Sequence, residues 1–99
     1  MATAQKNLSE FDPDQLPDAT GLSIGVVVAQ WNSEITHALA QGAIETLKRC
    51  GLQEDHILQW DVPGSFELIY GCQKMISNHQ ELDAIIAIGS VVEGETKHF

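Results

Sequence analysis

Three runs of mostly apolar residues divide this 99-residue chain, at residues 22–29, 56–62 and 83–89. The first and third runs are apolar almost throughout, without the polar alternation of a strand that has one face in water. Such runs are typical of parallel strands that are buried on both faces. Pro63 and Gly64 close the second run, because this pair interrupts a strand. We therefore expect three strands.

The segment between the first two runs has the period of an amphipathic helix. Its predicted buried stripe consists of Ile35, Leu39, Gly42, Ala43, Leu47 and Cys50. Asn32 or Ser33 can cap the start of this helix, and Glu34 suits its first turn. Gly51 can adopt the left-handed conformation that commonly ends a helix. The pattern thus predicts one long helix directly after the first strand.

A second helix is predicted from about residue 65 to residue 77, between the second and third runs. Its predicted buried stripe is Phe66, Ile69, Cys72 or Gln73, and Ile76, with Leu68 and Met75 at the flanks. The order is then β-α-β-α-β with short connections. Right-handed crossovers give a parallel sheet between helices, a three-layer α/β/α architecture with flavodoxin-like layering.

Polarity and charge separate the start of the chain from the rest. Residues 1–20 are polar, contain two prolines and show no periodicity, so we interpret them as a mobile arm before a domain that begins at residue 21. The formal net charge is −9, from 14 acidic and 5 basic side chains. Binding to nucleic acid or to an anionic membrane is not expected, since such partners are held by clustered Lys and Arg. A small anionic ligand is still compatible with this charge.

The two cysteines and the apolar runs indicate where the protein resides. Cys50 and Cys72 lie far apart, in no metal-binding spacing, and residues 1–20 contain no secretory apolar segment. We interpret both cysteines as reduced, packed thiols. Since no apolar run approaches the length that spans a membrane, we expect a cytoplasmic protein.

Distinctive residues follow each predicted strand. Because ligands bind outside the carboxyl ends of parallel strands, these residues are candidates for a site. Trp31 follows the first strand, where its ring can stack on a heterocycle or pack on its own helix. After the second strand, residues 63–67 join a tight turn to a helix start, and Glu67 can accept hydrogen bonds from hydroxyls. The alternative for Glu67 is an acidic first turn that stabilises a helix.

The segment after the third strand has the strongest chemical character. Gly94, Glu95 and Thr96 resemble an anion-holding turn, in which backbone groups and the Thr96 hydroxyl bind while the carboxylates point away. His98 is the candidate proton carrier, since histidine titrates near neutral pH. Glu93, Glu95 and His98 are an alternative set of metal ligands, but carboxylates on a solvated loop are commoner, and we predict no metal. Neither a Walker A pattern nor a G-x-G-x-x-G pattern is present.

Three blocks in this order resemble the lumazine synthase family. They are Trp31-Asn-Ser-Glu-Ile-Thr36 with Gly42-Ala43, Val62-Pro-Gly-Ser-Phe-Glu67, and Gly89-Ser-Val-Val-Glu-Gly-Glu-Thr-Lys-His-Phe99. The resemblance covers about residues 22–99 and is most specific in the third block. It implies a transferase of riboflavin biosynthesis that condenses 5-amino-6-(D-ribitylamino)uracil with 3,4-dihydroxy-2-butanone 4-phosphate. The product is 6,7-dimethyl-8-ribityllumazine, formed without a metal or organic cofactor.

The resemblance also implies roles for individual residues. Trp31 stacks on the pyrimidine, and His98 transfers protons. The remaining positions fall into three groups: Ser65, Phe66 and Glu67 hold the ribityl chain; Ser90, Val91 and Val92 contact the pyrimidine through their backbone; Gly94, Glu95 and Thr96 hold the phosphate. Family members work as pentamers or larger shells of identical subunits, with sites at subunit interfaces.

One departure from the family pattern is the position of Phe99. Family chains continue past the matching His-Phe, so residues 21–99 are expected to be the amino-terminal part of a single lumazine-synthase-like domain. The missing part carries an arginine for the phosphate and an aromatic residue from a neighbouring subunit. An alternative function is a non-catalytic assembly or carrier subunit that binds a flavin-like heterocycle, and a third is a generic phosphosugar-binding domain.

Overall fold

In the computed structural model, which describes residues 12–95, strands and α-helices alternate along the chain. In order, they are β1 (Ile24–Ala29), α1 (Ser33–Arg49), β2 (Ile57–Val62), α2 (Leu68–Asn78) and β3 (Ala84–Ile88). Short 3-10 turns occupy Pro13–Gln15, Glu54–His56 and Ser65–Glu67. The predicted β-α-β-α-β order is therefore confirmed, with each strand one or two residues shorter at its start than the sequence pattern suggested.

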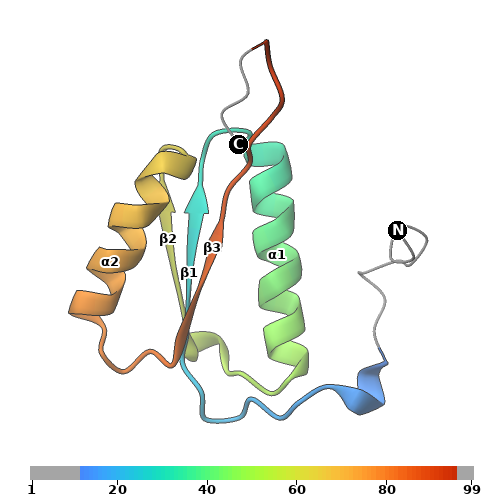
Figure 1. Ribbon diagram of the computed structural model, residues 1–99. Coiled ribbons are helices and arrows are strands. Elements are labelled where there is room, and N and C mark those ends of the chain that lie inside the picture. Colours follow the sequence, from blue (N-terminus) through green and yellow to red (C-terminus); the bar gives the residue numbers. More distant parts are fainter. Residues whose placement is uncertain (1–11, 96–99) are drawn as a thin grey trace.

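The described strands form one parallel sheet in the order β2-β1-β3. Ile24 of β1 is in register with Ile57 of β2 and with Ala84 of β3. Figure 1 shows α1 on one face of the sheet and α2 on the other. The predicted three-layer α/β/α architecture is confirmed. Because all three strands run in the same direction, their carboxyl ends meet at one edge, which is the upper edge in Figure 1.

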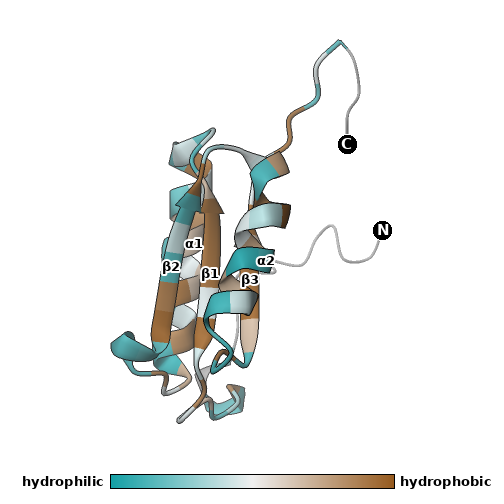
Figure 2. Ribbon diagram, turned by 90° about the vertical axis from the view of Figure 1, so that its left-hand side faces the viewer, coloured by the Kyte–Doolittle hydropathy of each residue, from teal (hydrophilic) through white to brown (hydrophobic). Residues whose placement is uncertain are grey.

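The core is built on the central strand, β1, whose six residues are all buried. Val26 and Val28 pack with Ala40 of α1 and Ile88 of β3. Figure 2 shows this strand as a hydrophobic band between more polar helix surfaces. On the other face, Met75 of α2 is fully buried. The absence of polar alternation in residues 22–29 thus correctly indicated a strand covered on both sides.

The two edge strands are less buried than we expected. Polar Gln59 and Asp61 of β2 are exposed, and so are Ala84 and Ala87 of β3. Each helix contacts β1 more extensively than it contacts either edge strand. Within residues 12–95, complete cover on both faces is therefore a property of β1 alone.

The predicted buried stripe of α1 was wrong in its amino-terminal half. Ile35 and Leu39 are 50% and 53% exposed, whereas Thr36 and Ala40 are buried. Ala43 packs partly buried against the core, as predicted. The small side chain of Ala40 lets the helix approach the sheet closely, and the Thr36 hydroxyl donates a hydrogen bond to the Asn32 carbonyl oxygen (3.5 Å). The contact face is therefore centred one residue later than the largest apolar side chains suggest.

The predicted stripe of α2 was wrong for the same kind of reason. Phe66, Ile69 and Ile76 are 85%, 71% and 60% exposed, and Gly71 and Met75 are buried instead. A Cβ at position 71 would lie 2.8 Å from Val62 Cγ1 and 3.0 Å from Val27 Cγ1. The helix thus touches the sheet at a residue that has no side chain, which a hydrophobicity pattern does not register.

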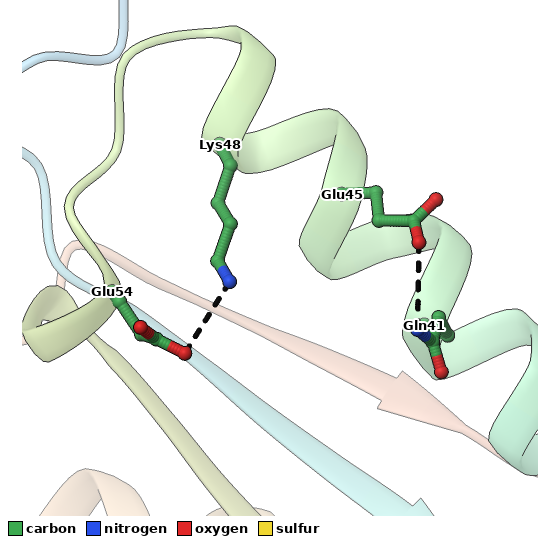
Figure 3. Close-up of polar contacts among 4 residues, drawn as sticks. All are labelled: Gln41, Glu45, Lys48 and Glu54. Carbon is green, nitrogen blue, oxygen red and sulfur yellow. Dashed lines mark hydrogen bonds and ion pairs between the residues drawn. The ribbon is translucent and has the colours of Figure 1, made fainter.

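The end of α1 is held by backbone geometry and by exposed polar contacts. Gly51 follows the helix with φ +100°, as predicted for a left-handed helix end. Lys48 Nζ lies 3.3 Å from Glu54 Oε1, and Gln41 donates to Glu45 (3.4 Å; Figure 3). The Lys48 and Glu54 side chains are 43% and 86% exposed, so their ion pair contributes at most about 1 kcal/mol.

The segment before β1 contributes one residue to the core. Ala19 is buried with Ile24 and Leu52, and its N–H donates to the Cys50 carbonyl oxygen (2.7 Å). Residues 1–11 of the predicted arm lie outside the described residues.

Cys50 and Cys72 are half-buried free thiols, and burial raises the pKa of the Cys72 thiol. Among residues 12–95, no helix is long and apolar enough to cross a membrane.

Candidate functional site

Three loops leave the sheet at the carboxyl ends of its strands and lie next to one another. Residues 30–32 follow β1, residues 63–67 follow β2, and residues 89–95 follow β3. Backbone hydrogen bonds join the first two loops, from Gln30 N–H to the Val62 carbonyl (2.7 Å) and from Trp31 N–H to the Pro63 carbonyl (3.0 Å). The predicted convergence of the three strand ends at one edge is confirmed for these residues.

The second and third loops are joined by a reciprocal pair of hydrogen bonds. The Ser65 hydroxyl donates to the Ser90 carbonyl oxygen (3.1 Å) and accepts from the Ser90 N–H (3.1 Å). Both residues are half-buried. One hydroxyl therefore satisfies both backbone groups of the residue at which the chain leaves β3, and it fixes that residue relative to the start of α2.

The first and third loops are joined by Asn32. Its side-chain Nδ2 donates to the Ser90 hydroxyl oxygen (3.0 Å). Asn32 has φ +61° and ψ +47°, and it is the only non-glycine residue with positive φ in the described chain. Asparagine is among the few residues that adopt this left-handed conformation readily. The prediction that Asn32 or Ser33 caps α1 needs correction, because Asn32 occupies the cap position but its side chain forms no cap hydrogen bond and turns to Ser90.

A glycine at position 89 allows the second and third loops to approach closely. A Cβ at Gly89 would lie 2.6 Å from Ser65 Oγ and 2.9 Å from Leu68 Cδ1, which leaves no room for a side chain. A Cβ at Gly64 would lie 3.4 Å from Glu67 Oε1, so within the second loop the Glu67 carboxylate lies beside Gly64. The Ser65–Ser90 contact therefore depends on the glycine that precedes Ser90.

Large apolar side chains at these strand ends are open to solvent. Trp31 is 51% exposed, Phe66 is 85% exposed, and Val91 and Val92 are 59% and 56% exposed. Such surfaces can cover a flat ring, since apolar and aromatic faces gain free energy when they are removed from water. The described part of this edge thus combines a hydrogen-bonded centre with an exposed apolar surround.

The charged end of the third loop is described only in part. Glu93 and Glu95 are exposed, and the predicted site residues Thr96 and His98 lie outside the described residues. Within residues 12–95, no group of three or more His, Cys, Asp or Glu side chains is placed to hold a metal ion.

One groove in the described part of the chain lies away from these loops. This groove of about 540 Å³ runs between the end of α2 and β3, where Cys72, Ile76 and Ile85 are among its lining residues. It is lined mainly by apolar atoms and contains none of the predicted site residues. We place the candidate site at the strand ends, because hydrogen-bonded polar groups of three loops meet exposed apolar side chains there.

Sequence reasoning missed the contact between Asn32 and Ser90. Only the identity of Asn32 could have signalled it, since an asparagine between a strand and a helix suits a left-handed turn as well as a cap. The partner of its side chain lies 58 residues away. A local sequence pattern cannot predict a contact between residues so far apart in the chain.

The chain is an α/β domain in which three loops converge at the carboxyl edge of a parallel sheet, the edge at which open sheets of this class generally bind ligands. Residues 21–99 match the 6,7-dimethyl-8-ribityllumazine synthase family. The chain belongs to this family.

Individual relatives agree with this assignment. The 6,7-dimethyl-8-ribityllumazine synthases of Christiangramia forsetii and Flavobacterium johnsoniae are both 52% identical to the chain, and that of Parabacteroides distasonis is 50% identical. Each similarity covers 100% of this chain, but only 59%, 52% and 61% of the respective relative. The chain therefore spans little more than half the length of these curated relatives.

Proposed function

We propose that the protein carrying this chain is a transferase that makes 6,7-dimethyl-8-ribityllumazine in riboflavin biosynthesis. Its substrates are 5-amino-6-(D-ribitylamino)uracil and 3,4-dihydroxy-2-butanone 4-phosphate, and phosphate and water are released. The observation that carries this proposal is family membership over residues 21–99, joined to the convergence of the family's three sequence blocks at one sheet edge.

The heterocycle occupies the surface beside the hydrogen-bonded centre. Trp31 stacks on the pyrimidine, a role supported by its half-exposed ring at the end of β1. The N–H of Ser90 is already bonded to Ser65, so the backbone of Val91 and Val92 supplies donors to the pyrimidine edge, and the Ser90 carbonyl contributes its second lone pair. Exposure of both valines leaves this backbone accessible from the solvent side.

The ribityl chain lies along the second loop. Ser65, Phe66 and Glu67 hold it, with the Glu67 carboxylate accepting hydrogen bonds from its hydroxyls. The position of this carboxylate beside Gly64 supports the assignment, since a glycine lets the ligand approach the backbone. The Ser65 hydroxyl is engaged with Ser90, so its backbone N–H at the helix start is the group offered to the ligand.

The phosphate and the proton transfers belong to the end of the third loop. Gly94, Glu95 and Thr96 hold the phosphate, and His98 moves protons while the imine forms, the phosphate is eliminated and the second ring closes. These steps need a group that titrates near neutral pH, and a histidine supplies it without a cofactor. The rest of the rate enhancement comes from holding two substrates in a reactive orientation.

Self-association in the cytoplasm, into a pentamer or a larger shell, completes the proposal. Large exposed apolar side chains on both helices support an assembly of identical subunits, because such surfaces are costly to leave in water. They are Ile35, Leu39, Ile69, Tyr70 and Ile76. The proposed partners are therefore the two small-molecule substrates and other copies of the same chain.

The test is steady-state condensation of the two substrates by the full-length protein, followed through the lumazine chromophore. Trp31→Ala should raise the KM for the pyrimidine, and His98→Ala should lower kcat. Turnover that is unchanged in both variants would reject the site assignment. Binding of lumazine or riboflavin without any turnover would favour a carrier subunit, and a failure of ribityl compounds to compete would favour a generic phosphosugar-binding domain.

A further inference from the structure

Asn32 is not itself among the predicted substrate-binding residues, yet it lies at the junction of two parts of the candidate site. Its backbone follows Trp31, whose N–H is bonded to the Pro63 carbonyl (3.0 Å). Its side chain reaches Ser90, the residue that precedes Val91 and Val92. The stacking ring and the backbone that faces the heterocycle edge are therefore connected through one asparagine.

The backbone conformation of Asn32 determines where its amide points. With φ +61° and ψ +47°, the chain turns sharply from β1 into α1, and Nδ2 is directed across the sheet edge to the Ser90 hydroxyl oxygen. An asparagine at a helix cap normally bonds the first turn of its own helix. In this structure the Asn32 side chain forms no cap hydrogen bond and instead bonds Ser90.

Ser90 is then held from two sides. Ser65 holds its backbone from the end of β2, and Asn32 holds its hydroxyl from the end of β1. Removing either contact leaves the other, so the chain is still expected to leave β3 at the same point. Without Asn32, however, the hydrogen bonds described above link the loop that carries Trp31 to the loop that carries Val91 and Val92 only through the second loop.

We propose that Asn32 is a positioning residue that sets the spacing between Trp31 and the Ser90 loop, and thereby the affinity for the pyrimidine substrate. This inference rests on the function proposed above. It predicts a selective effect: the KM for the pyrimidine rises, whereas kcat and the KM for the phosphorylated butanone stay within about twofold. The loss of one hydrogen bond corresponds to a rise of roughly 3- to 10-fold.

The experiment compares substitutions at Asn32 in the full-length protein. Asn32→Gly keeps the left-handed backbone and removes the amide, so the pyrimidine KM should rise. Asn32→Asp also tolerates the backbone conformation and can accept a hydrogen bond from the Ser90 hydroxyl, so it should recover most of the affinity. Gln41→Ala is the matched control, because it removes an exposed amide that bonds Glu45 on α1, away from the three loops (Figure 3).

A double-mutant cycle shows whether Asn32 acts through Ser90. Ser90→Ala removes the hydroxyl acceptor and keeps the backbone bonds to Ser65. In this background Asn32→Gly should change the pyrimidine KM no further, because the contact is already absent. Amide hydrogen exchange at Val91 should be faster in Asn32→Gly than in the wild type, and this readout does not depend on turnover.

The outcomes separate this inference from the proposed function. An inactive wild-type protein would contradict the proposed function. An active wild type whose pyrimidine KM is unchanged by Asn32→Gly would overturn the inference and leave the function intact. Equal losses for both substrates, or fold-changes that simply multiply in the double mutant, would also overturn it.

Discussion

The hydroxyl of Ser65 and the backbone of Ser90 satisfy one another through two hydrogen bonds of 3.1 Å, across 25 residues of sequence. Ser65 lies at the start of the segment that leads into α2, and its side chain binds the backbone of Ser90 just after the end of β3. Since Ser90 is half-buried, its N–H is partly shielded from water and would lose this partner if the hydroxyl were removed. Two of the three loops of the candidate site are held together by this one contact.

Ser65→Ala should therefore lower the free energy of unfolding by about 1 to 3 kcal/mol, the cost of leaving a shielded polar group without its partner. Ser77→Ala is the matched control. The Ser77 hydroxyl bonds the Gln73 carbonyl on the exposed side of α2 (3.0 Å), so its loss should change stability by less than about 0.5 kcal/mol. Urea denaturation measures both, and equal effects would contradict the importance of the Ser65–Ser90 contact.

Gly89→Ala should destabilise the protein and weaken pyrimidine binding, because the new Cβ would push against Ser65 Oγ and Leu68 Cδ1. Gly42→Ala provides the opposite case. Gly42 lies in α1, with nothing within 4 Å of an added Cβ, so alanine should stabilise the helix by about 0.5 to 1 kcal/mol. Thermal unfolding of the two variants should shift in opposite directions. A stabilising Gly89→Ala would show that the loops can separate without cost.

Met75→Ala should cost about 2 to 5 kcal/mol, because Met75 is fully buried between α2 and β1 and alanine would leave a cavity. Gly25 of β1 has no side chain at this point, and a Cβ there would meet the Met75 sulfur. Met75→Leu keeps the side-chain volume, so it should cost less than about 1.5 kcal/mol. Similar losses for both substitutions, measured by urea denaturation, would mean that Met75 does not fill the core.

Asp18 should titrate below its ordinary pKa of 3.8, because the side chain and the backbone N–H of Thr20 bond its carboxylate. A folded pKa below the unfolded one stabilises the folded state above pH 3.8, and this contribution is lost as the pH falls through the folded pKa. An NMR titration of the Asp18 carboxyl carbon reports the midpoint directly. Thr20→Val should raise that midpoint by removing the side-chain donor, and an unchanged midpoint would exclude the Thr20 hydroxyl as the main cause of the low pKa.

The sequence alone was sufficient for the order of the elements and for their approximate ends. The uninterrupted apolar run at residues 24–29 can be buried only between two layers, and Gly51 ends α1 in the left-handed conformation predicted for it. The three loops of the candidate site follow from this order, because parallel strands bring their carboxyl ends to one edge. The order of strands and helices alone therefore predicts that one site contains Trp31, Ser65 and Ser90.

Only the tertiary structure decided which helix faces are covered and what holds the loops together. Gly71 and Ala40 are buried against the sheet, whereas the larger Ile69 and Leu39 remain exposed. A helix can approach a sheet most closely at its smallest residues. A hydrophobic pattern gives most weight to the largest side chains, so it predicts the wrong face. The side chain of Asn32 shows the same limit of sequence-based prediction in the candidate site. Its local sequence permits a helix cap, and only the position of a hydroxyl 58 residues away turns its side chain to Ser90.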